Sequence, residues 1–381
     1  MASPARMPVA VRQAVSGLPT TIAWIRAPAE IDPLADEWRA LEASVQDRTV
    51  LSTFDYNASW YHHYGHAGVE TLIGLARRGS SLVGVAPLVI RRRRIGKVPL
   101  TCIEFAAHEA YAGEFLVEDD SPDALVLFVE SLAATTRFDL ICLNGLEMGS
   151  DRFRPLREAA ARLRLRIELT DHPNAMVDLS RGYEQYFRSR SPHFRHAVRR
   201  YTRRIEDRGE RRVDGVLLRR GIDRLDATVD RMIAVNEASY KLGGRHLADA
   251  HRGFLSELAR RFGPRGMLAL PILSIGGRDA AYVCGLVERG CFYDVTLAYD
   301  DAFAQLRPGT HLIQELLRDL AGAGVHTVIS HGAHDYKKHW ATAFLPSTRV
   351  FMFSSSLKAS ATRLLRFRLA SFWRWLGVDE P

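Results

Sequence analysis

One order of elements occurs twice in this sequence, about 190 residues apart, and it limits the possible folds more than any other feature. In the first copy, apolar and β-branched residues alternate in a way that predicts strands, and one longer stretch has helical spacing. The predicted elements are a hairpin of strands 71–76 and 82–90, a strand at 101–106, a helix at 121–135 and a closing strand at 139–143.

The second copy predicts the same order with clearer turn signals. Its elements are a hairpin of strands 267–274 and 280–288, a strand at 291–299, a helix that begins at about Gly309, and a strand that ends at Ser330. Hairpins supply antiparallel pairs, and a strand-helix-strand unit supplies a parallel pair. The pattern β-β-β-α-β, present twice, therefore predicts a duplicated α/β (α+β) fold with mixed sheets.

The start of the second-copy helix is a candidate anion site. The first backbone N–H groups of a helix have no internal partner, and the helix dipole favours negative charge there. We therefore predict that residues 307–311 bind the phosphates of a cofactor: Arg307, Pro308, Gly309, Thr310 and His311. The alternative is that Pro-Gly forms only a turn and a helix cap. In the first copy, the corresponding turn, 118–122, is acidic and would repel phosphate.

A lysine pair follows the second copy. Of the 52 basic residues only five are lysines, and two of these, Lys337 and Lys338, are adjacent. An ammonium group is a compact point charge, whereas guanidinium is a planar fork. The pair therefore indicates a role that lysine performs better, and the alternative is two solvated side chains after a strand.

Length and composition set broad limits. A chain of 381 residues with 47% hydrophobic and 25% charged residues is typical of a soluble protein with two domains or two halves. No apolar run approaches a membrane span, and residues 1–20 lack the apolar core of a secretory signal, so we expect a flexible leader and a cytoplasmic protein. The four cysteines have no metal or redox spacing, which predicts free thiols.

The net charge of +8 is concentrated between the two copies. There, Phe194, Val198, Tyr201 and Ile205 recur at helical spacing, and arginines fill the other positions, which predicts a basic amphipathic helix. Such a helix could bind nucleic acid, an anionic lipid surface or phosphates, or it could be a solvated face. A second basic and aromatic helix is predicted at the carboxy terminus, where it could touch a membrane or fold back onto the protein.

Histidines raise the question of a metal. His331, His334 and His339 lie near Asp335, and three more histidines, His62, His63 and His66, lie in the first half of the chain. Their spacing does not match a helical zinc motif, and no glutamate base accompanies them. We therefore expect no metal site.

Taken together, these residues resemble the GNAT acyltransferase superfamily, and specifically its duplicated CelD-like branch, which is associated with cellulose and exopolysaccharide functions and related to the Fem peptidyltransferases. The resemblance covers roughly residues 30–350. It rests on short motifs in both halves: Trp38-x-x-Leu41, Phe54 and Trp60, 82–88, Ser191 with Arg195 and 199–200, Tyr293-Asp294, Tyr299-Asp300, Pro308-Gly309 with Leu312, and Gly332-x-x-x-Tyr336-Lys337-x-x-Trp340.

The resemblance implies a tandem GNAT-like fold. The expected division is a leader at 1–20, a first half at 21–180, a basic helical connector at 181–215, a second half with the donor site at 216–353, and a carboxy-terminal helix at 354–381.

It also implies transfer of an acyl group from acetyl-CoA or another acyl-CoA to an amine. The family's pyrophosphate loop is matched only by Arg307, Gly309 and the helix start. Fem relatives carry an aromatic-lysine pair late in the fold, which Tyr336-Lys337 matches, so Lys337 is expected to stabilise negative charge. The general base is left open among Asp335, Asp294 and His331.

Either Tyr293 or Tyr336 is expected to protonate the departing sulfur. For the acceptor, we expect Glu109, Tyr111 and Glu114 to hold a cationic amine between the halves, with Tyr299 as a further contact.

Two other functions remain open. The first is a Fem-like aminoacyltransferase that uses aminoacyl-tRNA on the basic helix, although a nucleic-acid partner is not the leading expectation because the long helical arm of some Fem enzymes is absent. The second is a non-catalytic partner of a polysaccharide-synthesis complex. We expect a monomer or homodimer, with possible peripheral contact to a membrane or to such a complex.

Overall fold

The computed structural model describes residues 19–66, 68–95, 98–107, 113–146, 153–239 and 245–369. It contains two mixed β-sheets with helices on their faces, which confirms the predicted α/β class. Most of the predicted leader, the end of the predicted carboxy-terminal helix, and two predicted acceptor residues, Glu109 and Tyr111, lie outside the described residues.

The first sheet has the strand order β1-β2-β3-β4-β6-β15-β7, and β5 pairs with β3 beside that path. All of its pairs are antiparallel except β4 with β6. Its strands are β1 (Thr20–Ile25), β2 (Val69–Arg78), β3 (Ser81–Ile95), β4 (Val98–Phe105), β5 (Leu116–Val117), β6 (Leu140–Leu146), β7 (Arg166–Asp171) and β15 (Thr348–Phe353).

The second sheet has the order β9-β10-β11-β12-β13-β8-β14, and its parallel pair is β12 with β13. Its strands are β9 (Arg211–Leu217), β10 (Leu268–Ile275), β11 (Arg278–Glu288), β12 (Cys291–Tyr299), β13 (Thr327–Ser330), β8 (Asn174–Asp178) and β14 (Ala343–Leu345). Position by position, this sheet repeats the first one, which confirms the predicted duplication.

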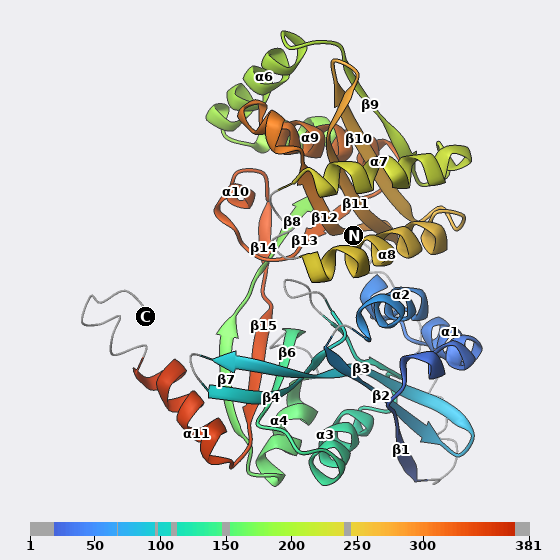
Figure 1. Cartoon of the computed structure of the whole chain (residues 1–381), viewed down its shortest axis with the longest axis vertical. Coiled ribbons are helices and arrows are strands. Elements are labelled where there is room, and N and C mark those ends of the chain that lie inside the picture. The colour runs from blue at the N-terminus through green and yellow to red at the C-terminus, as the bar shows by residue number, and fades with distance from the viewer. Residues whose placement is uncertain are drawn as a thin grey trace, which may run out of the picture.

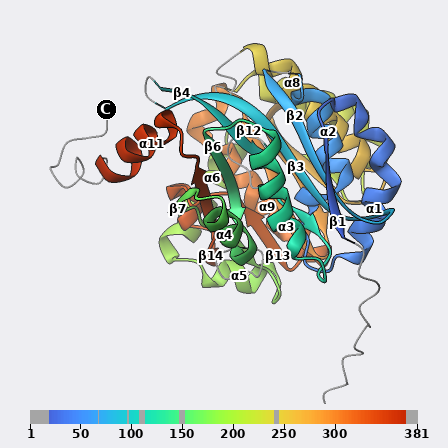
Figure 2. The ribbon, with the colours of Figure 1, turned by 90° about the horizontal axis from the view of Figure 1, so that it is seen from below.

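The crossover helices of the two copies are α3 (Asp123–Thr135) and α9 (Pro308–Gly322). Each connects the two parallel strands of its own sheet, as the predicted strand-helix-strand units require. In Figure 2, α3 and α4 (Phe153–Arg162) lie together on one face of the first sheet. The corresponding outer face of the second sheet carries α5 (Tyr183–Ser189), α6 (Pro192–Glu206) and α9.

The two halves exchange strands. β8, which follows the first half in sequence, pairs with β13 and β14 in the second sheet, and β15 returns to the first sheet between β6 and β7. Two chain segments, β7–β8 and β14–β15, therefore run side by side from one sheet to the other (Figure 1). The sheets thus do not follow the expected boundaries at residues 180 and 353.

A shared core fills the space between the sheets. Four helices supply it: α1 (Ala35–Ser44), α2 (Phe54–Tyr64), α7 (Leu225–Glu237) and α8 (Arg245–Phe262). The Phe254 ring of α8 lies 5.8 Å from Tyr56 and 5.5 Å from Tyr64 of α2. Burial of each such ring contributes about 1.5–3 kcal/mol, so this core fixes how the halves sit against each other.

Short 3-10 helices complete the connections. They are Pro28–Glu30, Asp32–Leu34, Val50–Ser52, Ile222–Arg224 and Asp301–Leu306.

The basic helix between the copies is confirmed as α6. Phe194, Val198 and Ile205 are buried against the second half, whereas Tyr201 is only partly buried. Its arginines at 199, 200, 203 and 204 are exposed. The apolar face packs on α9 and on the 3-10 helix before it, so α6 lies beside the predicted anion site.

At the carboxy-terminal end, α11 (Leu357–Arg363) continues into a π-helical turn, Leu364–Leu369, and packs on β4 and β15 of the first sheet. The four cysteines are free thiols, as predicted, and burial raises the pKa of Cys102 and Cys284 to about 12. Within the described part of the chain, none of the helices combines the length and the apolar character needed to cross a bilayer.

Candidate active site between the two halves

Strands β12 and β13 separate at one point, and several predicted site residues lie there. Their parallel pairing ends with Tyr293 opposite Ile329, whereas β12 continues to Tyr299. On its other side, β12 has a bulge against β11 immediately after Asp294, where the register shifts. A bulge redirects neighbouring side chains, and bulges are common beside functional sites.

Asp294 joins the two strands at this point. The Ser330 hydroxyl donates a hydrogen bond of 2.5 Å to Asp294 Oδ2. This bond joins the end of β13 to β12 one residue beyond their last backbone pair. The other carboxylate oxygen, Oδ1, is buried and has no hydrogen-bond partner among the described residues. A buried acceptor without a partner costs free energy.

The predicted Tyr336-Lys337 pair splits between surface and interior. In the short helix α10 (Asp335–Lys338), Tyr336 is exposed and stacks on His334, whereas Lys337 is only 4% exposed. Its ammonium donates a hydrogen bond to the His331 carbonyl oxygen. Lys337 thus holds the turn that positions His331, and it brings a positive charge close to it.

His331 is a neutral imidazole at physiological pH. Burial lowers its pKa to about 3, with smaller contributions from the nearby charges of Lys337 and His172. A base this weak can accept a hydrogen bond but takes up very little proton at pH 7. His331 is therefore better suited to orient an amine than to deprotonate it.

Asp335, a predicted base, is on the surface. Its side chain is 94% exposed and accepts a hydrogen bond of 2.7 Å from Lys338. The adjacent lysines thus have different surroundings, since Lys338 pairs at the surface with Asp335 and Lys337 enters the interior. The structure does not bring Asp335 together with Tyr293, Asp294 or His331.

The predicted anion site at the start of α9 is only partly as expected. Arg307 is exposed and has a left-handed backbone, with φ at 54°, and no side chain caps the helix. The carbonyl of Arg307 accepts hydrogen bonds from the N–H groups of Thr310 and His311 at 3.1 and 3.3 Å. Gly309 packs closely on Leu297 of β12, where an added Cβ would lie 3.2 Å from the leucine side chain.

The His311 side chain points into the protein instead of toward a ligand. It is 1% exposed, with Thr202 Oγ1 at 3.0 Å from Nδ1 and Arg211 Nη1 donating to Nε2 at 2.9 Å. Because a guanidinium only donates, Nε2 must carry the lone pair and the ring must be neutral. Burial accordingly lowers the pKa of His311 to about 4.

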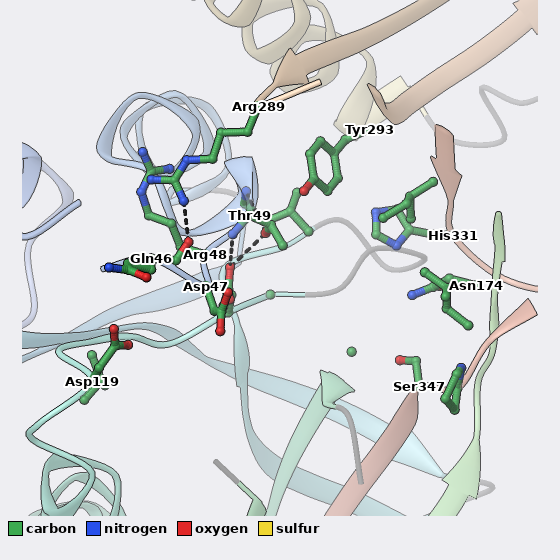
Figure 3. A pocket seen from close by; sticks show the side chains of 18 of the residues that line it. Gln46, Asp47, Arg48, Thr49, Asp119, Asn174, Arg289, Tyr293, His331 and Ser347 are labelled. Carbon is green, nitrogen blue, oxygen red and sulfur yellow. Dashed lines mark hydrogen bonds between the residues drawn. The ribbon is translucent and has the colours of Figure 1, made fainter. Parts of the chain in front are cut away.

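A cavity of about 870 Å³ lies between the halves, next to the separation of β12 and β13. Tyr293, Ile329 and His331 of the second half line one side of it. The first half supplies residues 46–49, 113–114 and 117–119 and the start of α3, and the connecting strands supply Asn174, Leu345 and Ser347. In Figure 3, the Tyr293 hydroxyl points across the cavity toward Thr49, and His331 lies above Asn174.

Glu114, a predicted acceptor residue, lies on the first-half wall. Its Oε2 accepts hydrogen bonds from the backbone N–H and the hydroxyl of Thr49, at 2.9 and 2.8 Å. These two donors fix the carboxylate in one orientation inside the cavity. Tyr299, the other described acceptor candidate, pairs with Ala281 at the far end of β12 and does not line this cavity.

Two arginines at the cavity were missed by the sequence analysis. Arg48 forms a nearly buried ion pair with Glu288, at 2.8 Å, and also donates to the Glu42 carbonyl. Arg289, in the turn between β11 and β12, has φ at 50° and donates to the Gln46 carbonyl. Both link the halves at the rim. The Arg289-Gly290 turn between two strands was a usable signal, whereas no motif marked Arg48.

The cavity is acidic on the first-half side. Besides Glu114, it is lined by Asp47, Glu118 and Asp119, and burial together with the charge of Asp120 raises the pKa of Glu118. Tyr293, on the other side, has a pKa raised by burial and stays a protonated phenol. Among the described residues, no three histidine, cysteine or carboxylate side chains are placed to hold a metal ion.

Comparisons with known proteins agree with this architecture. Residues 192–338, from the start of α6 to Lys338, match the family model "Acetyltransferase (GNAT) domain". No curated protein sequence matches the chain.

Several solved structures share its fold at low identity. A crystal structure of FemX has a TM-score of 0.54 and 13% identity, over 87% of this chain and 98% of that one. The C-terminal domain of a putative lysylphosphatidylglycerol synthetase from Agrobacterium fabrum has a TM-score of 0.51 and 13% identity, over 89% and 97%. L-PGS from Bacillus licheniformis has a TM-score of 0.50 and 10% identity, over 87% and 94%. The chain thus has a tandem GNAT-like fold, and its residues 192–338 match the GNAT acetyltransferase domain.

Proposed function

We propose that this protein transfers an acyl group from an acyl-CoA to an amine. The observation that carries the proposal is the cavity between the halves, where Tyr293 and His331 of the GNAT-matched half face Glu114 of the first half. An acidic wall suits a cationic amine, and the opposite wall offers a phenol and a neutral imidazole. The donor belongs on the second half, at the start of α9.

The spacing of these two places supports the assignment. From Tyr293 to Tyr299, β12 rises about 20 Å at roughly 3.3 Å per residue, and the start of α9 packs on this far end of the strand. Coenzyme A carries its thiol on a long pantetheine arm with two amide groups. With its phosphates at Arg307 and Gly309, the arm would lie along the part of β12 that extends beyond β13, and its thioester would reach Tyr293.

Each side chain then has a role. Glu114 holds the acceptor as it enters as an ammonium ion, which loses one proton to solvent before it attacks. His331 then accepts a hydrogen bond from the neutral amine and orients the amine lone pair toward the thioester carbonyl. When the amine attacks, negative charge develops on the carbonyl oxygen, and Lys337 is the nearby positive charge. The protonated phenol of Tyr293 donates its proton to the departing thiolate. The nitrogen of the tetrahedral intermediate loses its second proton to solvent in the cavity, and Tyr293 is reprotonated from the same solvent. Asp294 does not line the cavity and is assigned no part in this transfer.

A donor-binding experiment tests this function. We expect acetyl-CoA or a longer acyl-CoA to stabilise the protein by about 2.7 kcal/mol at a hundred times its dissociation constant, measured by thermal unfolding. Lys337→Ala should lower kcat about a hundredfold with little change in donor affinity. Lys338→Ala, which removes the neighbouring exposed lysine, is the matched control and should retain activity. Equal activity of the two variants would remove Lys337 from the mechanism.

Aminoacyl transfer from tRNA is the second candidate, and one observation favours it. The exposed arginines of α6 form a basic surface next to the start of α9, where the donor is placed, and they are Arg199, Arg200, Arg203 and Arg204. FemX shares the fold, but a structural similarity at 13% identity does not indicate which substrate this chain uses. If bulk tRNA stabilises the protein and no thioester does, this candidate replaces the first. Its binding should weaken steeply with salt.

The non-catalytic alternative makes a different prediction, since neither donor would then bind. A role in cell-envelope or exopolysaccharide synthesis rests on the family resemblance alone. It becomes testable once the acceptor is identified by screening amines against the acyl-CoA that binds.

A further inference from the structure

The carboxy-terminal helix is firmly attached to the first sheet on one face. Ala359 and Thr362 are buried, and the ring of Phe367 lies 5.2 Å from Phe351 and 5.9 Å from Phe353 of β15. Arg363 adds a hydrogen bond of 2.7 Å to Glu168 of β7. The helix therefore has a fixed orientation, and its outer face is presented in one defined direction.

That outer face carries three exposed leucines. Leu357 is 89% exposed, Leu364 51% and Leu365 53%, and these are three of the six most exposed large apolar side chains among the described residues. A leucine that moves from water to an apolar environment gains about 1.5–3 kcal/mol, and the fold leaves this gain unused at three neighbouring positions. Leu364 and Leu365 are adjacent, and Leu357 lies seven residues, about two helical turns, before them. A group of exposed apolar side chains on one element marks an interaction site more often than scattered single residues do.

The surroundings of the patch are basic. Residues 354–369 contain Lys358, Arg363, Arg366 and Arg368 and no aspartate or glutamate. Lys358 and Arg366 are exposed, and the Arg366 guanidinium also lies 5.6 Å from the Phe351 ring centre. Arg363 is paired with Glu168 of β7, which leaves Lys358 and Arg366 as exposed cations near the leucines. Exposed leucines flanked by cations are typical of helices that lie in the interface of an anionic membrane.

We propose that the outer face of α11 and the following turn docks on an anionic phospholipid surface. The three leucines would enter the interface, and Lys358 and Arg366 would contact lipid phosphates. A second copy of this chain fits less well, because a symmetric contact would place these cations against each other. Three leucines also cover far less than the roughly 800 Å² per partner of a stable protein interface.

Docking in this way leaves the proposed active site open. In Figure 1, α11 lies on the outer side of the first half, far from α6 and α9. The cavity lining contains no residue of α11. The inference therefore stands whether or not the acyltransferase proposal holds.

Vesicle co-sedimentation of the full chain tests it. We expect the protein to bind vesicles of equal parts phosphatidylcholine and phosphatidylglycerol. Its affinity for vesicles of phosphatidylcholine alone should be lower by about tenfold or more. The double change Leu364→Glu with Leu365→Glu should reduce binding to the anionic vesicles at least about tenfold. Leu169→Glu, at an exposed leucine of β7 that faces elsewhere, is the matched control and should bind as the wild type does.

A second pair of variants separates the patch from the overall charge. Lys358→Glu with Arg366→Glu should weaken binding about tenfold, whereas the same charge change on α6, Arg199→Glu with Arg203→Glu, should have a much smaller effect. Equal loss in both variants would show that net charge alone drives binding, and it would overturn the proposal. So would unchanged binding of the leucine variant. A wild-type dimer that becomes monomeric in that variant, without vesicle binding, would assign the patch to a second copy. Far-UV circular dichroism confirms that each variant is folded.

Discussion

The starts of α3 and α9 occupy equivalent places in the two sheets but have opposite charges. Before α3 lie Glu118, Asp119 and Asp120, and the first turn adds Asp123. Before α9 stands Arg307, and the first turn of that helix has no acidic residue. The same backbone arrangement therefore occurs twice, but the start of α3 suits a cation and the start of α9 suits an anion. The side chains around each helix start decide which charge is stable there.

The next turn of each helix differs as well. If Pro122 is placed opposite Pro308, the buried Leu125 of α3 corresponds to the buried His311 of α9. The leucine needs no partner, whereas the histidine requires Thr202 and Arg211 to satisfy its nitrogens. The second half therefore pays a desolvation cost that the first half avoids, and α6 and β9 supply the compensating hydrogen bonds.

The largest expected effect tests whether the halves are independent at all. Val177 of β8 is fully buried and pairs with Val328 in the second sheet, although its neighbour β7 belongs to the first. Val177→Asp buries an unpaired carboxylate and should lower the free energy of unfolding by about 4 kcal/mol or more. Urea unfolding measures it. Leu169→Asp, on the exposed part of β7, is the control. If part of the Val177→Asp protein still unfolds in a separate transition at the wild-type urea midpoint, the two halves fold independently.

The next test concerns the acidic side of the comparison. Glu114→Gln removes the charge that Thr49 orients, so the acceptor should lose a charge-assisted hydrogen bond of about 2 kcal/mol, or about 30-fold in KM. Steady-state kinetics with a saturating donor gives this number. Glu118→Gln also lies in the cavity lining but lacks the two Thr49 hydrogen bonds, and we expect a smaller change there. A larger effect at Glu118 would move the acceptor toward the start of α3.

The pH dependence of stability tests the difference at the second turn. His311 and His331 have folded-state pKa values of about 4 and about 3, below the unfolded value of about 6.5, so folding favours their neutral forms. Their protonation in the unfolded chain therefore lowers stability as the pH falls below about 6.5, by about 2 kcal/mol each at pH 5. His62 acts in the opposite direction, because its hydrogen bond to Glu257 raises its pKa.

Urea unfolding at pH 7 and pH 5 checks this prediction. Between pH 7 and pH 5, the free energy of unfolding of His311→Gln should fall by about 2 kcal/mol less than that of the wild type. His62→Gln should lose more than the wild type, since it removes a group that stabilises the fold when protonated. If His311→Gln retains the wild-type pH dependence, the buried imidazole is not neutral as its hydrogen bonds indicate.

The smallest expected effect separates charge from backbone at the start of α9. Arg307 and Arg164 both adopt the left-handed region, with φ at 54° and 55°, which glycine tolerates better. Arg307→Gly and Arg164→Gly should each raise stability by about 1 kcal/mol. Only Arg307→Gly should also weaken the binding of acyl-CoA, about fivefold, when the two are compared by calorimetry. Equal affinities would place the donor phosphates elsewhere.

Much of the fold could be predicted from the sequence because its signals are local. The two hairpins, the crossover strands and the basic helix follow from alternation, helical spacing and glycine turns, and each appears within a few residues of its expected bounds. Of the candidate site, Tyr293 and Glu114 line the cavity between the halves, and the roles predicted for them stay predictions. Arg48, Thr49 and Asn174 were missed because they lie in polar segments without a recognisable motif. Only the folded structure places them at a cavity opposite residues of the other half.

The separate fates of Tyr336 and Lys337 illustrate the same limit. The sequence singled out the pair, but it could not indicate that one side chain is exposed and the other lies beneath His331. Adjacent residues of a short helix point about 100° apart, and only the surrounding fold decides which of them faces the interior.

By itself, the sequence determined the repeated order of elements, the opposite charges at the two helix starts and the basic helix between the copies. These depend on residues close together in the chain. Tertiary structure alone decided that β8 and β15 change sheets, that His311 faces inward, and that the cavity is built from both halves. The physical reason is that periodicity specifies a strand and its buried faces, whereas the partner of each strand is selected by long-range packing of the shared core.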